Sequence, residues 1–99
     1  MLSVMTDAIE LIGSAVPRRA SGAVQAEVDG ELILLSPKDF GYFGAEGAGG
    51  AVWELIDGER SIDAIVTSLE ADYLAGPGVI RGETLTYLEA LVAAGLVEV

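Results

Sequence analysis

The sequence contains no cysteine and no histidine. Without thiols there is neither a disulfide framework nor a thiolate zinc site, which fits a cytoplasmic protein. Without imidazole there is no histidine base and no histidine metal ligand. Carboxylates catalyse only where they converge in a pocket, whereas the acidic clusters at 27–31 and 57–63 fall at expected turns and helix caps. We therefore predict no enzyme, no catalytic residues, no metal site and no cofactor.

Basic residues are scarce as well. Five Lys and Arg stand against sixteen Asp and Glu, so the net charge is -11. Such a chain repels polyanions, and residues 82–99 contain no Lys or Arg to contact phosphates. We predict no nucleic-acid partner. The acidic surface is either simply solvated or selects basic partner peptides.

The chain also lacks a long apolar run. No uncharged stretch approaches the roughly 18 residues of a membrane-spanning helix, and residues 1–16 lack a basic start and carry Asp7 and Glu10. The apolar residues of this segment fit either a short amphipathic helix or a frayed leader, and the missing basic residues argue against membrane docking. We predict no membrane partner.

The length of 99 residues fits one domain. We expect residues 1–19 to form a flexible N-terminal extension that could cover a strand edge, and residues 20–99 to form the folded domain. No internal repeat or linker divides the chain.

Extended segments come first along the chain. Residues 24–28 and 31–35 flank Asp29-Gly30, which is a two-residue hairpin signal. Ser36-Pro37 breaks the second strand, and residues 40–45 offer a third, rich in aromatics and glycine. This third strand should lie at the outside of the sheet. It has no Lys, Pro or charge within 41–45, so it is an edge that could accept an extended peptide as an added strand.

Helices fill the rest of the chain, at about 49–57, 61–73 and 80–94. Gly58 can take a left-handed cap conformation, Ser61 can cap the second helix, and Gly95 stops the third. The glycines between 41 and 50 have no following Lys, so they fail the nucleotide-loop patterns. Strands followed by helices predict an α+β fold: a three-stranded antiparallel sheet and three helices, in a winged helix-turn-helix-like arrangement.

The third helix carries two neighbouring apolar rows. One holds Thr84, Leu88 and Leu91, and the other holds Leu85, Leu88, Glu89 and Val92. A helix of this size needs only one row for its own core. The second row is therefore either a wide core face or one side of a groove next to the strand edge, with Leu85 and Val92 lining it.

These features together resemble the PqqD-like family, the recognition elements for ribosomally made and post-translationally modified (RiPP) peptides. The resemblance covers about residues 22–99. The residues that carry it are Leu34-Leu35-Ser36-Pro37, Tyr42-Phe43, Trp53-Glu54-Leu55-Ile56-Asp57-Gly58, Ile62, Ile65-Val66, Leu69, Tyr73, Leu88, Leu91 and Gly95-Leu96-Val97.

The resemblance implies a non-catalytic adaptor that binds the leader segment of a precursor peptide as an extra strand. The implied leader-peptide-binding residues are Tyr42, Phe43, Gly44, Ala45, Leu85, Leu88, Glu89 and Val92. With Asp39-Phe40-Gly41 before Tyr42-Phe43, the chain looks most like the stand-alone leader-binding protein of lasso peptide biosynthesis, a route to antibiotics. Its implied partners are the precursor leader peptide, a leader-cleaving cysteine protease and a cyclase.

Two alternatives remain open from the sequence. The first is a PqqD-type chaperone for another peptide-derived product, such as the quinone cofactor after which the family is named. The second is a winged-helix DNA-binding regulator, which the absence of basic residues in 82–99 disfavours.

Overall fold

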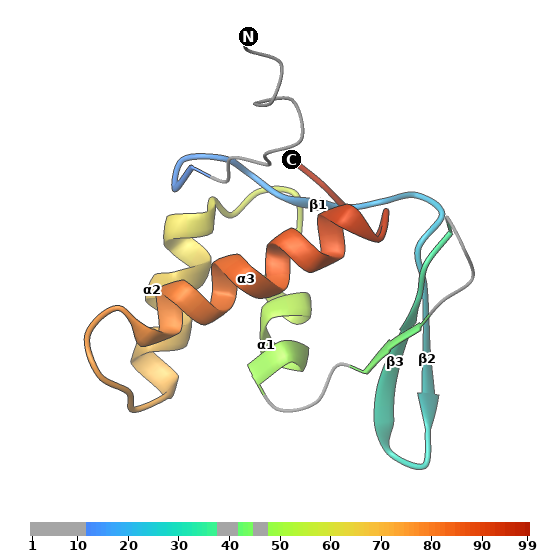
Figure 1. The fold of residues 1–99 in the computed structure, drawn as a ribbon, viewed down its shortest axis with the longest axis horizontal. Helices are drawn as coiled ribbons and strands as arrows, with labels where there is room; N and C mark the ends of the chain where they lie inside the picture. Colours follow the sequence, from blue (N-terminus) through green and yellow to red (C-terminus); the bar gives the residue numbers. More distant parts are fainter. Residues whose placement is uncertain (1–11, 38–41, 45–47) are drawn as a thin grey trace, which may run out of the picture.

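The computed structural model describes residues 12–37, 42–44 and 48–99. Short strands precede three helices, and a last short strand follows them (Figure 1). The elements are β1 (Arg18–Arg19), β2 (Val24–Val28), β3 (Glu31–Leu35), β4 (Tyr42–Gly44), α1 (Ala48–Leu55), α2 (Ile62–Asp72), α3 (Val79–Ala93) and β5 (Val97–Glu98). The α+β class is confirmed.

The predicted hairpin is present. β2 pairs antiparallel with β3, and the connecting residues Asp29 and Gly30 both have positive φ, 53° and 82°. A two-residue loop of this kind needs positive φ at both positions, which Asp tolerates and Gly adopts without strain. β4 pairs antiparallel with the other side of β3, so the sheet order is β2-β3-β4.

The helix boundaries follow local signals. Gly58 adopts φ 79°, and the Ser61 side chain accepts a hydrogen bond of 3.1 Å from the backbone N–H of Ala64. Asp63 lies in the first turn of α2, where the helix dipole favours negative charge. Gly95, also at φ 79°, directs the chain from α3 into β5.

The prediction of a single sheet needs correction. β1 and β5 form a second, two-stranded antiparallel sheet, in which Arg18 lies opposite Glu98 and Arg19 opposite Val97. Pairing between segments about eighty residues apart leaves no local trace in a sequence, which is why it was missed. The expected domain boundary between residues 19 and 20 stays a prediction, and it falls directly after β1.

The described part of the N-terminal segment packs on the start of α2. The carbonyl of Gly13 accepts a hydrogen bond of 2.9 Å from the N–H of Asp63, and the carbonyl of Ala15 accepts one of 2.9 Å from Ile62. Residues 12–19 therefore supply acceptors for N–H groups in the first turn of a helix, which have no partner within it. Of the expected segment 1–19, residues 1–11 lie outside the described residues.

The core lies where the three helices meet one face of β3. Leu34 is its contribution from the sheet, and Trp53, Ile65, Leu88 and Leu91 are fully or almost fully buried among the helices. Burying side chains of this size stabilises the fold by about 1.5–3 kcal/mol each. These buried side chains thus serve as the scaffold of the fold.

Candidate functional site

The open edge of the larger sheet is its most accessible backbone feature. β4 is the last strand in the order β2-β3-β4, and within the described residues no further strand pairs with it. Gly44 is exposed, and a Cβ added there would meet nothing within 4 Å. Of the predicted strand residues, Tyr42, Phe43 and Gly44 lie in β4, and Ala45 lies outside the described residues.

The predicted residues of α3 differ in accessibility. Leu88 has an exposed fraction of 0%, so its side chain belongs to the core and offers no surface to a peptide. Leu85 and Val92 are half-buried against the core, and Glu89 is exposed. Leu85, Glu89 and Val92 share one flank of α3 with Arg81, because they follow it by four, eight and eleven residues, which are positions on the same side of a helix.

That flank faces the start of α2. The guanidinium of Arg81 forms an ion pair with the Asp63 carboxylate at 2.8 Å, and Asp63 lies in the first turn of α2. In Figure 1, β1 passes above α3 and α1 lies below it. The assignment of Leu85, Glu89 and Val92 to a groove beside β4 stays a prediction, and these contacts favour the other flank.

The opposite flank of α3 faces the side where β4 leads into α1. Tyr87 lies there: a Cβ built on Gly49, in the first turn of α1, would lie 3.2–3.4 Å from the Tyr87 ring. The Ser36 hydroxyl, directly after β3, donates a hydrogen bond to the carbonyl of Ala94, seven residues beyond Tyr87. We call this the Tyr87 flank. Sequence reasoning missed it, although a glycine without a side chain at 49 and an aromatic ring at 87 were both available as signals.

Two hollows meet at the Tyr87 flank. The deeper one, here called the helical cavity, has a volume of about 340 Å³ and lies between the start of α1, the end of α2 and the start of α3. Its walls include Val52, Leu69, Ile80 and Tyr87. A more open hollow continues along α3 past Thr86 and Ala90, and both share Glu83 and Tyr87.

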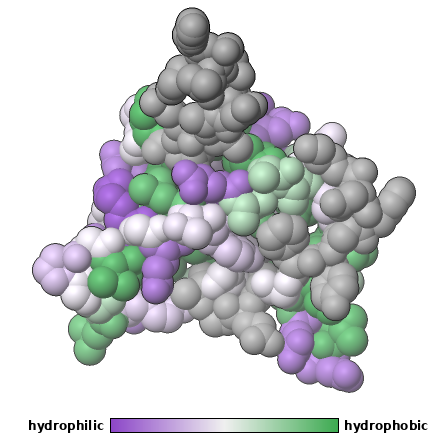
Figure 2. Space-filling view, in the orientation of Figure 1, coloured by the Kyte–Doolittle hydropathy of each residue, from purple (hydrophilic) through white to green (hydrophobic). Residues whose placement is uncertain are grey.

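Apolar surface continues beside the cavity. Leu74, in the connection between α2 and α3, is fully exposed with a relative accessibility of 104%, and it lines the cavity mouth. Figure 2 shows hydrophobic surface gathered at the end of the molecule where this connection lies. Leu74 thus extends the apolar lining of the cavity to the molecular surface.

The Tyr87 hydroxyl adds one polar group to this apolar setting. It is buried and has no hydrogen-bond partner among the described residues. Burial raises the pKa of Tyr87, so the hydroxyl keeps its proton at neutral pH and remains a donor. A buried donor without a partner is costly to the fold.

The described arginines all have partners elsewhere. Three form ion pairs and the fourth donates to a main-chain carbonyl: Arg18 with Glu98 at 3.3 Å, Arg60 with Asp57 at 2.9 Å, Arg81 with Asp63 at 2.8 Å, and Arg19 with the Trp53 carbonyl at 2.7 Å. The Tyr87 flank instead presents Glu83. Its field therefore favours a neutral or basic ligand.

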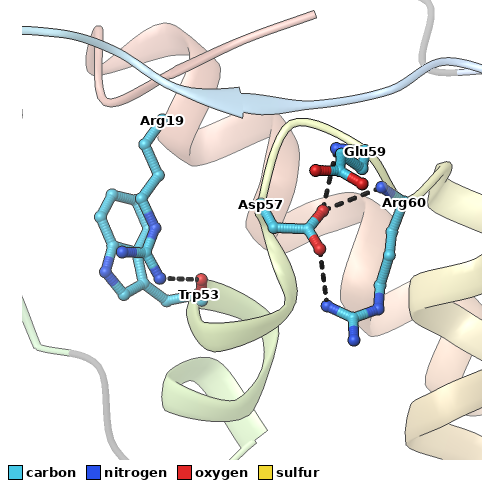
Figure 3. A network of polar contacts seen from close by, with 5 residues as sticks. All are labelled: Arg19, Trp53, Asp57, Glu59 and Arg60. Carbon is cyan, nitrogen blue, oxygen red and sulfur yellow. Dashed lines mark hydrogen bonds and ion pairs between the residues drawn. The ribbon is translucent and has the colours of Figure 1, made fainter.

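Arg19 ties β1 to α1 (Figure 3). Its guanidinium lies 4.5 Å from the centroid of the Trp53 ring and donates to the carbonyl of the same residue. The indole N–H of Trp53 in turn donates to the side chain of Gln25 in β2 at 2.9 Å. Arg19 thus holds the smaller sheet against the helical core. Gln25, through its hydrogen bond with Trp53, connects the larger sheet to the same core.

The turn between α1 and α2 is fixed by a carboxylate. Asp57 accepts hydrogen bonds of 2.9 Å from the backbone N–H groups of Arg60 and Glu59, and from the Arg60 side chain (Figure 3). These backbone hydrogen bonds, from Arg60 first and then Glu59, hold the pKa of Asp57 below its ordinary value. The acidic cluster at 57–63 is therefore used in caps and turns.

The described residues, 12–37, 42–44 and 48–99, also bear on metal and membrane binding. No group of three or more candidate metal ligands occurs there. None of the helices there is both long and apolar enough to cross a bilayer.

The protein is a compact α+β domain with an open strand edge and two hollows along one flank of α3. These accessible features suit an extended ligand. Residues 31–97 match the family model described as coenzyme PQQ synthesis protein D (PqqD), and the chain belongs to the PqqD family.

A solved structure gives a second likeness. It is titled "TbiB1 in Complex with the TbiA(beta) Leader Peptide" and matches with a TM-score of 0.71 and 26% sequence identity, over 82% of this chain and 94% of that one. No curated protein sequence matches this chain.

Proposed function

We propose that this protein is a non-catalytic adaptor that binds the leader segment of a ribosomally synthesised precursor peptide. The leader adds as a strand to the edge of β4, which lies at the end of the sheet without a further partner strand among the described residues. That open edge is the observation that carries the proposal. The likeness to TbiB1, whose structure contains a leader peptide, supports it.

The fold, which is a variation on a winged helix-turn-helix, supports the same proposal. In a DNA-binding version the third helix would read bases and carry basic residues. Here α3 has one arginine, and that arginine is paired with Asp63. The helix instead borders the ligand, and we place its contact surface on the Tyr87 flank, with Glu83 and Ala90 beside Tyr87.

The adaptor presents the bound leader to the enzymes that mature the precursor. For a lasso peptide these are a leader-cleaving cysteine protease and a cyclase, working with the adaptor in the cytoplasm. A small domain that holds the leader by its backbone leaves the rest of the precursor accessible, which suits delivery from one enzyme to another.

The energies fit a reversible complex. Four strand hydrogen bonds at about 1 kcal/mol net and two or three anchor side chains at about 2 kcal/mol each give roughly 8–10 kcal/mol. Ordering a flexible leader costs about 2–5 kcal/mol. These contacts alone correspond to micromolar or weaker binding, and preorganisation or charge complementarity would tighten it.

The family match favours one second candidate, a chaperone for another peptide-derived product such as the quinone cofactor named in the family description. Both candidates use the same strand edge. They differ only in which precursor binds, so the identity of the tightest leader separates them.

The test is fluorescence polarisation with a panel of fluorescein-labelled leader peptides, the TbiA(beta) leader included, each beside its scrambled sequence. We expect at least one leader to saturate at micromolar protein while its scrambled control does not. The tightest of these is called the reference leader below. If no leader binds better than its scrambled form, the proposed function is wrong.

A further inference from the structure

We propose that the outer face of the larger sheet holds a specificity subsite, in which an aromatic side chain of the bound leader covers Gly44 and packs on Ile33. The outer face is the side of β2, β3 and β4 that points away from the helical core. This inference rests on the proposed function and adds to it which kind of leader residue is selected at one position.

Alternation along β3 identifies the outer face. Leu34 is fully buried in the core, so its neighbours Ile33 and Leu35 point to the other side of the sheet. Leu35 is 36% exposed, and Ile33 is half-buried although it lies outside the core cluster. Outward positions that face only water are usually polar. The sequence of β3 is instead typical of a strand that is covered on both faces.

β2 shows the same feature more strongly. Its core-side residue Gln25 accepts the hydrogen bond from the Trp53 indole, whereas Val24 and Val28 point outward and are 52% and 50% exposed. The Asp29-Gly30 turn fixes the register of the hairpin, so a slip by one residue cannot bring the two valines inside. The outer face therefore carries an apolar surface across β2 and β3.

Gly44 leaves a gap where this apolar surface reaches β4. It lies directly opposite Ile33, so a side chain at position 44 would point to the outer face. Gly44 is exposed, and a Cβ built there would meet nothing within 4 Å. Position 44 therefore contributes no side chain to cover Ile33 from the side of the open edge.

A leader strand added to β4 must place side chains on the outer face. Side chains alternate between the two faces of a strand, and the leader residue opposite Gly44 shares the face of Ile33. Neighbouring strands lie about 4.8 Å apart, so this leader residue is about 10 Å from β3. A short side chain does not span that distance, whereas an aromatic ring can lie over Gly44 and contact Ile33. Aromatic residues stabilise glycines of neighbouring edge strands in this way.

Charge favours the leader over a second copy of the protein as the occupant. Glu31 lies opposite Val28 on the outer face, and each copy has a net charge of -11. Two such faces brought together would repel each other. An aromatic ring from the leader brings no charge to this face.

Photo-crosslinking locates the leader residue opposite Gly44. p-Benzoylphenylalanine replaces each residue of the reference leader in turn, and mass spectrometry identifies the protein residue to which each variant crosslinks. We expect one leader position to crosslink most strongly to Ile33, and we call it the outer position. If no leader position crosslinks to β3, the subsite is wrong.

Substitution at the outer position tests the selection. Reference leaders with phenylalanine, leucine or alanine there are compared by fluorescence polarisation. We expect phenylalanine to bind about fivefold more tightly than leucine or alanine, the size expected of an aromatic contact with a β-branched residue on one sheet face. Equal affinities for phenylalanine and leucine would show that general hydrophobicity, and not reach across Gly44, decides binding, and would contradict the inference.

Ile33→Thr tests the protein side of the contact. It keeps a β-branched residue and removes most of the aliphatic surface. Val28→Thr is the matched control, because Val28 is on the same face but in β2, beyond the reach of the ring. We expect the preference for phenylalanine over leucine to fall below about twofold in Ile33→Thr and to stay unchanged in Val28→Thr. A general loss of stability would affect both leaders alike, so the ratio isolates the contact. Equal ratios in the two variants would contradict it.

Gly44→Thr tests the gap without changing the apolar face. Gly44 does not have positive φ and has free space at its Cβ, so the variant should fold with its Tm level or increased. Its new side chain occupies the place of the ring. The preference for phenylalanine over leucine should therefore fall below about twofold, and an unchanged preference would overturn the inference.

The failures can be told apart. If the reference leader binds but shows no aromatic preference at the outer position, the subsite is wrong and the proposed function stands. If no leader binds at all, both fall. If sedimentation shows a dimer that both Ile33→Thr and Val28→Thr dissociate, a second copy of this chain covers the outer face and the inference is overturned.

Discussion

The two flanks of α3 carry different side chains and have different surroundings. The flank with Arg81, Leu85 and Val92 faces the start of α2, where Arg81 is paired with Asp63. The Tyr87 flank borders two hollows and contains a buried hydroxyl without a partner among the described residues. The flank with Arg81 is called the closed flank below, and the Tyr87 flank is called the open flank.

The difference teaches where recognition can occur in a strongly acidic chain. Three of the four described arginines neutralise carboxylates, and the fourth is held by Trp53. On the open flank, the Glu83 carboxylate forms no ion pair within the described residues. Because contacts within the chain occupy the described arginines, the open flank is the side on which an added strand can form new contacts.

The largest expected effect comes from the leader backbone. A strand on the edge of β4 uses the N–H groups of every second residue, because alternate ones point away. N-methylation of alternate leader residues in the pairing register should weaken binding about a hundredfold, since several hydrogen bonds of about 1 kcal/mol each are lost together. Methylation in the other register should have little effect. Polarisation titrations compare the two, and equal losses would exclude strand addition.

The next effect concerns the contacts that hold β1 to α1. Arg19→Ala removes the hydrogen bond to the Trp53 carbonyl and the ring contact, and we expect it to lower the free energy of unfolding by about 2 kcal/mol. Arg18→Ala removes only an exposed pair with Glu98 and should cost less than about 0.5 kcal/mol. Urea denaturation measures both. Equal losses would show that the Arg19 contacts do not hold β1 to α1.

A third pair of changes compares the flanks themselves. Tyr87 and Leu85 are both half-buried and pack against the core, so Tyr87→Ala and Leu85→Ala should both lower stability, by about 2–4 kcal/mol. Only Tyr87→Ala should also weaken the reference leader, by about tenfold or more, in protein shown by circular dichroism to be folded. If Leu85→Ala weakens binding instead, the groove predicted from the sequence lies on the closed flank after all.

The smallest effect is on pH dependence. Because backbone hydrogen bonds lower the pKa of Asp57 in the folded state, its contribution to stability is fully present above its unfolded pKa. That contribution is lost as the pH falls below about 4 and through the folded pKa. Asp57→Ala should therefore lower the midpoint of urea denaturation at pH 7 more than at pH 3. A difference that does not shrink in acid would contradict this account of the turn.

Local features of the fold were predictable because local residues determine them. Asp29-Gly30 specifies its hairpin by tolerating positive φ, and Ser61 specifies the start of α2 by its hydroxyl. The β1–β5 pairing was not predictable, since neither Arg18-Arg19 nor Val97-Glu98 signals its partner.

The candidate site was only half predictable, for a geometric reason. Helical spacing identifies Leu88 and Leu91 as the core row of α3 and places one flank on either side of it. It does not say which flank faces the sheet, because the packing of α3 against α1 and α2 decides that. The open strand edge was found in the sequence, and the Tyr87 flank needed the contact between Tyr87 and Gly49.

The central claim is that a leader peptide lies between the edge of β4 and the open flank of α3. Amide and methyl NMR of labelled protein, titrated with the reference leader, tests it most directly. The account predicts large chemical-shift changes at Gly44, Ile80 and Tyr87, and small ones at Leu85 and Val92. Changes centred on Leu85 and Val92, with Gly44 unaffected, would contradict it.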